Sequence, residues 1–217
     1  MNQLYFAPGA CSFVPHVGLE LIKAATGEDF EPKLVKLHKG EHKTPEYLAL
    51  NPNGQVPTLV VDGKPIVQIV AICDYLDRQY PQAGLMPTDA WTRTQALSDL
   101  AWMNNTVHST FTHVFRPDHY AEEEAAKEHI KKVGAKNFRA LLERLQEKVK
   151  QAAPFWFGAK PTFHDAYAFT FLRWGGFAGI DPKSLPAYHE YIQRVIAHPA
   201  VAAAMGRERV ALDTYKG

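Results

Sequence analysis

Strand-like segments occur only in the first 80 residues of this chain, and every longer apolar pattern after them has helical spacing. The first part predicts alternating strands and helices, with strands at 4–6, 29–37, 58–61 and 65–67 and helices at 12–25, 45–50 and 68–80. A strand, a helix and a strand in succession favour a parallel pair, whereas Asp62-Gly63 is a hairpin signal. The chain should therefore begin with a mixed βαβ–ββα unit.

Residues 81–90 are rich in Pro, Gly, Thr and Asp, which is typical of a linker. Helices are expected after it at 91–119, 122–150, 166–174, 186–198 and 200–205. Thr162 and Asp165 have the spacing of a helix capping box. The predicted fold class is α/β plus all-α, with one domain at 1–80, a linker at 81–90 and an all-helical domain at 91–217.

Composition excludes several kinds of partner. The chain has 217 residues, with 24 basic and 23 acidic side chains and a net charge of +1, so it offers no bulk electrostatic argument for nucleic acid or an anionic membrane. Its two cysteines, Cys11 and Cys73, exclude a disulfide framework. We expect a cytoplasmic protein, because no export signal or membrane span is evident, and its partner should be a small molecule or a second protein chain.

Cys11 follows a Pro8-Gly9 break and precedes a predicted helix. A helix N-terminus stabilises an anion through its partial positive charge and its unpaired N–H groups. Three interpretations remain open on this basis. Cys11 is a reactive thiolate, the turn holds a ligand's thiolate, or Cys11 is a small buried hydrophobic residue, as most free cysteines are.

The order and spacing of several short motifs resemble those of the cytosolic glutathione transferases, most closely the bacterial beta class. These motifs are Pro8-Gly9-Ala10-Cys11-Ser12, Pro15-His16, Asn51-Pro52-Asn53-Gly54-Gln55-Val56-Pro57, Ala71-Ile72 with Tyr75-Leu76, Thr162 with Asp165-Ala166-Tyr167, and His198-Pro199-Ala200-Val201. The resemblance covers nearly the whole chain. It implies a thioredoxin-like first domain that binds glutathione as co-substrate, a helical domain that holds a hydrophobic electrophile, and a homodimer.

The resemblance also implies a glutathione site. A proline at Pro57 is cis in such folds, which turns the N–H and C=O of Val56 toward the ligand, next to Gln55. The γ-glutamyl end would meet Gln68 and Ile69, where Ile stands in place of the usual serine. Losing that hydroxyl costs about 1.5–3 kcal/mol of binding free energy, so glutathione should bind more weakly. Lys39, or His38 beside it, would meet the glycyl carboxylate.

For catalysis, the resemblance implies roles for Cys11, Ser12 and His108. Cys11 would lie beside the glutathione sulfur or form a mixed disulfide with it, Ser12 would donate a hydrogen bond, and His108 would point toward the sulfur. The candidate pocket for the electrophile consists of four aromatic residues, Phe111, Phe115, Trp174 and Phe177. No histidine has the spacing of a zinc motif, so no metal is expected.

Two other functions remain as alternatives to the attack of glutathione on a hydrophobic electrophile. One is glutathione-dependent thiol-disulfide exchange through Cys11, which a single cysteine performs by way of a glutathionyl adduct. The other is a non-catalytic binding or interaction protein that has kept the fold, and the substitution at Ile69 is the best argument for it.

Overall fold

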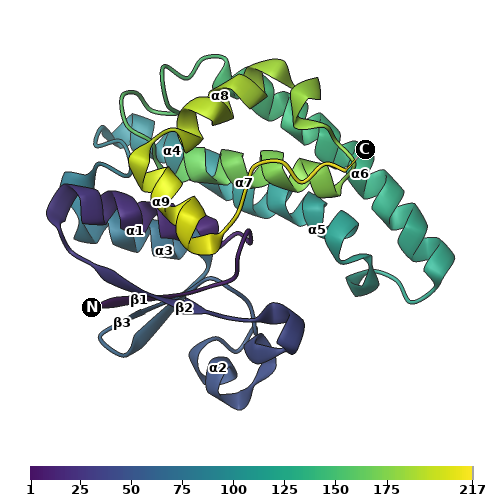
Figure 1. The fold of residues 1–217 in the computed structure, drawn as a ribbon, viewed down its shortest axis with the longest axis horizontal. Helices are drawn as coiled ribbons and strands as arrows, with labels where there is room; N and C mark the ends of the chain where they lie inside the picture. Colours follow the sequence, from purple (N-terminus) through teal and green to yellow (C-terminus); the bar gives the residue numbers. More distant parts are fainter. Residues whose placement is uncertain (217) are drawn as a thin grey trace.

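The computed structural model describes residues 1–216, and its first part contains a four-stranded mixed sheet. The elements are β1 (Asn2–Phe6), α1 (Phe13–Thr26), β2 (Phe30–Leu34), α2 (Pro45–Leu50), β3 (Thr58–Val61), β4 (Lys64–Val67) and α3 (Ile69–Gln79). The strand order is β2-β1-β3-β4, with β1 parallel to β2 and antiparallel to β3. The βαβ–ββα prediction is confirmed, including the hairpin between β3 and β4 (Figure 1).

The second part is helical. It contains α4 (Ala90–Trp102), the π-helical segment η4 (Met103–His108), α5 (Ser109–Phe115), α6 (Glu124–Val149), α7 (Phe163–Phe177), α8 (Pro186–Ile196) and α9 (Pro199–Glu208). The long helix predicted from 91 to about 119 runs through α4, η4 and α5 from Ala90 to Phe115; a wider π turn replaces the α-helical spacing at residues 103–108, and the helix ends at Phe115 instead of near His119. Short 3-10 turns occupy 37–39, 41–43, 81–83, 117–119 and 182–184.

The capping box at the start of α7 is confirmed. The Thr162 hydroxyl accepts the N–H of His164 at 3.3 Å, and the Asp165 carboxylate accepts the N–H of Thr162 at 2.7 Å. Both side chains satisfy backbone donors that the first turn of a helix leaves unpaired. This cap fixes where α7 enters the core.

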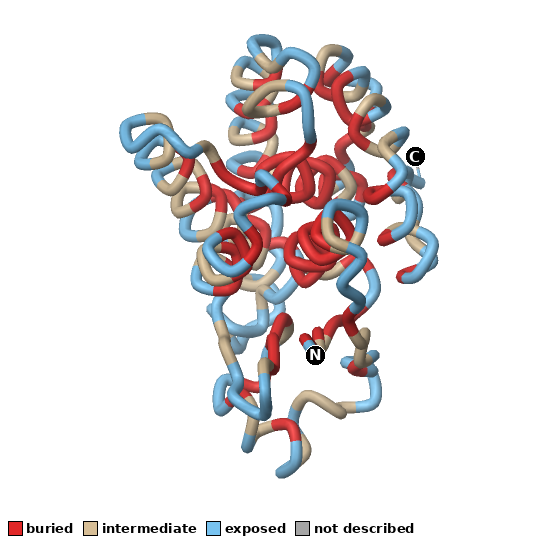
Figure 2. Tube along the Cα trace, turned by 90° about the vertical axis from the view of Figure 1, so that its left-hand side faces the viewer, coloured by how far each residue is buried: buried red, intermediate tan, exposed pale blue. Residues whose placement is uncertain are grey.

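Helix α1 lies between the sheet and α7, and α9 packs beside it (Figure 1). A Cβ added at Gly18 of α1 would stand 2.2 Å from the ring of Phe163 in α7, so the absence of a side chain allows the two helices to approach closely. The ring centroids of Phe13 and Phe169 are 4.8 Å apart. The sheet and the helical part thus share one core, and Figure 2 shows the buried residues concentrated in the middle of the molecule.

The connection between α3 and α4 is packed against the rest of the protein. Ala83, Leu85 and Met86 within it are 5%, 0% and 5% exposed. The division into domains at residues 81–90 stays a prediction, because the core continues across it. None of the helices in residues 1–216 combines the length and the hydropathy that a bilayer-spanning helix needs.

Candidate active site

The loop between β1 and α1 carries Cys11, and the helical part holds this loop by its backbone. The N–H of Gly9 donates to Oε2 of Glu208 at 2.8 Å, and the C=O of Gly9 accepts Nε1–H of Trp174 at 2.9 Å. Gly9 has a φ of +68°, a conformation that favours glycine. Oε1 of Glu208 lies 2.8 Å from Nδ1 of His16, and both side chains are fully buried. The position of Cys11 therefore depends on α7 and α9.

Ser12 closes the same loop from inside. Its hydroxyl accepts the N–H of Ala7 at 3.1 Å and donates its proton to the C=O of Ala7 at 3.2 Å. The residue is 0% exposed. A hydroxyl has only one proton to donate, so in this arrangement Ser12 has none left for a ligand.

Cys11 is a buried thiol whose Sγ donates to the C=O of Val56 at 3.5 Å. Burial raises its pKa to about 12, and the negative charge of Glu208 adds to this, while backbone hydrogen bonds at the helix start oppose it. A pKa this high disfavours the thiolate form of Cys11 in the free protein, and the reactivity of Cys11 stays a prediction. Desolvation of the charged sulfur outweighs the field of the helix N-terminus.

The Val56-Pro57 peptide bond is cis, as the resemblance implies. The preceding turn is fixed because the C=O of Gln55 accepts both the hydroxyl of Tyr47 and the amide of Asn51, each at 2.7 Å. The N–H of Val56 donates to no acceptor among residues 1–216. A rigid backbone donor is thus available next to the Cys11 thiol.

The other predicted glutathione contacts lie at the start of α3 and in the loop after β2. Gln68 is exposed and has a φ of 72°, whereas the side chain of Ile69 is 4% exposed and belongs to the core. Only the backbone N–H of Ile69, in the first turn of α3, remains for a ligand. Lys39 is exposed at the end of a 3-10 turn, and it forms no ion pair in the described part of the chain.

His108 ends the π-helical segment η4 and contacts two residues of α7. Its Nδ1 lies 2.9 Å from the hydroxyl of Tyr167, and its ring packs edge-on against Trp174 with centroids 4.9 Å apart. Burial lowers the pKa of His108 to about 4, so the ring is neutral at pH 7. Since Trp174 also bonds Gly9, a single side chain connects His108 with the Cys11 loop.

The four aromatic candidates form two pairs. Phe111 and Trp174 are 4% and 6% exposed and stack with centroids 4.5 Å apart, so they are part of the core beside the site. Phe115 and Phe177 are 65% and 48% exposed. Of these four, Phe177 lines a surface hollow, which it shares with Val114, Glu128, Lys131, Lys132, Ala135 and Ala178.

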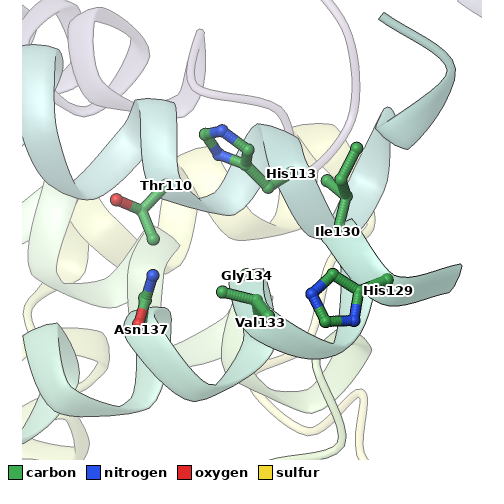
Figure 3. Close-up of a pocket in the computed structure, with 7 residues that line it drawn as sticks. All are labelled: Thr110, His113, His129, Ile130, Val133, Gly134 and Asn137. Atoms are coloured by element: carbon green, nitrogen blue, oxygen red, sulfur yellow. The ribbon is translucent and has the colours of Figure 1, made fainter. Parts of the chain in front are cut away.

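A second hollow lies between α5 and α6. Thr110 and His113 of α5 line it together with His129, Ile130, Val133, Gly134 and Asn137 of α6 (Figure 3). Within residues 1–216, no group of three or more His, Cys, Asp or Glu side chains is arranged to hold a metal ion.

Sequence reasoning missed Glu208, Arg173 and the role of Tyr167. Glu208 bonds a residue 199 positions away, which no local pattern reveals. The guanidinium of Arg173 covers Gly9, since a Cβ there would stand 2.5 Å from Nη1. Tyr167 is part of the Asp165-Ala166-Tyr167 motif, but its hydrogen bond to His108 depends on the tertiary packing of α7 against η4.

Comparison with known proteins explains why these parts occur together. Residues 3–78 match the model of the glutathione S-transferase N-terminal domain, and residues 103–199 match that of the C-terminal domain. Glutathione S-transferase GST-4.5 of Xanthomonas campestris is 34% identical over 208 residues, which are 95% of this chain and 98% of that relative. The chain belongs to the glutathione S-transferase family.

Solved structures of similar proteins agree with the assignment of this transferase to the family. A glutathione transferase homologue from Sulfitobacter, with bound glutathione, superposes with a TM-score of 0.88 at 26% identity and covers 97% of this chain and 99% of its own. A bacterial beta class glutathione S-transferase from Sphingomonas chungbukensis has a TM-score of 0.81 at 28% identity, covering 96% and 100%. The C-terminal family match of the transferase includes His108 and Trp174 and ends before Glu208.

Proposed function

We propose that this transferase binds glutathione between the Cys11 loop, the Val56-Pro57 turn and the start of α3, and joins it through its sulfur to a hydrophobic electrophile. The observation that carries the proposal is the unpaired N–H of Val56 beside the cis bond, next to the Cys11 thiol. The backbone of a ligand can form hydrogen bonds with an unpaired backbone N–H of this kind, as an added β-strand does. The Sulfitobacter neighbour, which was solved with bound glutathione, supports it.

Cys11 acts in this proposal as a hydrogen-bond donor and not as a nucleophile. A thiol with a pKa near 12 keeps its proton at neutral pH. When glutathione binds along the backbone of Val56, the S–H of Cys11 turns from the C=O of Val56 to the sulfur of the ligand. A hydrogen bond to a charged sulfur stabilises the thiolate by about 1.5–3 kcal/mol, which lowers the thiol pKa by about one to two units.

The remaining contacts follow from where the side chains lie. Lys39 and the first-turn amide of Ile69 are the donors for the two carboxylates of glutathione, with Gln68 beside the γ-glutamyl end. Phe115 and Phe177 supply exposed aromatic surface for the electrophile, and the buried Phe111 and Trp174 support them. Ser12 holds the shape of the loop.

The test combines binding and turnover. Titration calorimetry with glutathione should give heat that saturates in the millimolar range, and an activated aryl chloride should be conjugated. Cys11→Ala should lower kcat/KM about tenfold and Cys11→Ser should restore part of it, while Cys73→Ala, in the core of α3, is the matched control. Absence of binding heat would overturn the proposal. Full activity in Cys11→Ala would remove Cys11 from the mechanism.

The competing exchange reaction is measured on the same proteins. A glutathionylated peptide should not be reduced at a rate above background, because exchange requires the thiolate form of Cys11. A homodimer, which the resemblance implies, and a cytoplasmic location, which the sequence analysis leads us to expect, stay predictions. Sedimentation of the purified chain tests the first of these.

A further inference from the structure

The hydroxyl of Tyr167 lies between Asn104 and His108. It donates to Oδ1 of Asn104 at 3.1 Å and lies 2.9 Å from Nδ1 of His108. Tyr167 is 0% exposed, so water does not compete for these bonds. The amide nitrogen of Asn104 donates to Oδ1 of Asn105 at 3.1 Å, which identifies Oδ1 of Asn104 as the acceptor that faces Tyr167.

The direction of these bonds determines the tautomer of His108. A phenol has one proton, and Tyr167 gives it to Asn104. The bond to His108 must then run the other way, from Nδ1–H of the imidazole to the phenol oxygen. A neutral imidazole carries a single N–H, so Nε2 of His108 holds the lone pair. In water the neutral ring prefers the opposite tautomer.

The π-helical segment sets up this arrangement. Asn104 and His108 are four residues apart within η4, and both reach the same residue of α7. π-helical turns inside α-helices occur frequently at functional sites. Within residues 1–216, Nε2 of His108 has no hydrogen-bond partner, and the residue keeps part of its surface exposed.

This neutral ring is close to the Cys11 loop. Trp174 packs against the ring of His108, and its Nε1–H donates to the C=O of Gly9, two residues before Cys11. One side chain, Trp174, therefore separates His108 from the loop that carries Cys11.

We propose that Tyr167, aligned by Asn104, is a positioning residue that holds His108 as the Nδ1–H tautomer and so leaves Nε2 to accept the proton of the glutathione thiol. The proposal rests on glutathione being the substrate. The S–H bond breaks with its electron pair kept on sulfur, and the proton forms the Nε2–H bond of an imidazolium. The sulfur pair then forms the C–S bond, the leaving group departs with its own bonding pair, and the imidazolium releases its proton to water.

The first experiment reads the tautomer without any substrate, from the imidazole ¹⁵N chemical shifts of His108 at pH 7. The wild type should show Nδ1–H. Tyr167→Phe should shift the ring toward Nε2–H, and Asn104→Ala should do so as well, because the proton of Tyr167 then turns to Nδ1. Asn104→Asp, which keeps an acceptor, should restore Nδ1–H.

The second experiment measures kcat/KM for glutathione. Tyr167→Phe and Asn104→Ala should each lose about tenfold, with KM for the electrophile unchanged, and Asn104→Asp should recover most of it. The matched control is Tyr188→Phe, because Tyr188 is equally buried and donates to the C=O of Ala168 at 2.8 Å. It should change neither the tautomer nor the rate.

Three results would overturn the proposal. The first is an Nε2–H tautomer in the wild type, and the second is an unchanged Nδ1–H signal in both Tyr167→Phe and Asn104→Ala. The third is a shifted tautomer with full kcat/KM in both variants. Should Tyr167→Phe fail to fold, Asn104→Ala decides alone. Absence of glutathione binding contradicts the proposed function and leaves the tautomer measurement valid.

Discussion

The carboxylate of Glu208, at the end of α9, accepts the backbone N–H of Gly9, two residues before Cys11, at 2.8 Å. The same carboxylate bonds Nδ1 of His16 with its other oxygen. Two residues near the start of the chain thus share one buried carboxylate from near its end. The loop that carries the Cys11 thiol is therefore held by Glu208, which lies beyond the residues 103–199 that match the C-terminal domain of the family.

Removing this acceptor should be costly. Glu208→Ala leaves the N–H of Gly9 and the ring of His16 buried without a partner, and breaking a buried pair in this way costs about 3–5 kcal/mol. Urea unfolding should show this loss. The matched control is Glu190→Ala, whose side chain is 78% exposed and pairs with Arg194, and it should cost less than about 1 kcal/mol. Equal losses in the two variants would contradict the structural role of Glu208.

Cys11 should react slowly in the folded protein. A pKa near 12 in place of 9.0 lowers the thiolate fraction at pH 7.5 about a thousandfold, and iodoacetamide reacts with the thiolate. Mass spectrometry should find neither Cys11 nor the buried Cys73 modified under conditions that label both in urea. Labelling of Cys11 within minutes in the folded chain would mean that it exists as the thiolate.

Two glycines in helices should respond to alanine with opposite signs. Gly18→Ala would place a Cβ 2.2 Å from the ring of Phe163 and push α1 away from α7, so we expect a loss of about 3 kcal/mol or more. Gly206→Ala in α9 has nothing within 4 Å and should gain about 0.5–1 kcal/mol from helix propensity. Thermal unfolding measures both. A neutral Gly18→Ala would show that the contact between α1 and α7 is loose.

Acid should destabilise the protein through its buried histidines. Burial lowers the pKa of His108 to about 4 and lowers that of His164 below 6.5, so between these values the unfolded chain binds more protons than the folded one. The contribution of these two histidines to the free energy of unfolding is present above pH 6.5 and is lost as the pH falls. For His108 the loss between pH 7 and pH 5 is about 2 kcal/mol.

The measurement compares urea unfolding at pH 7 and pH 5. His108→Gln should reduce the difference between the two pH values by the amount that His108 contributes. His119→Gln, at an exposed position, is the control and should retain the wild-type difference. A His108→Gln variant with the full acid sensitivity would show that His108 titrates normally.

Local chemistry allowed much of the fold to be predicted, because periodicity, the Asp62-Gly63 hairpin and the Thr162 cap act over a few residues. The π turn at 103–108 within the long helix was not predicted, and the bonds that Asn104 and His108 of this turn form with Tyr167 come from another helix. The cis bond at Pro57 followed from a motif and not from propensity.

The candidate site shows the same limit. The position of Cys11 before a helix was predictable. The stabilising effect of that helix N-terminus on a thiolate was predictable as well. What the sequence did not reveal is how deeply α7 and α9 bury the sulfur, and this burial determines its pKa. Glu208 and Arg173 approach Gly9 only through tertiary packing.

The burial of α1 against both α7 and α9 restricts how such chains exchange parts. A chimera joined near residue 85 would combine the α1 surface of one parent with the α7 and α9 surfaces of another. It would require a glycine opposite Phe163 and a carboxylate opposite Gly9. Recombination between relatives is therefore compatible with folding only when these contact surfaces are inherited together, although they lie in separate family matches or beyond them.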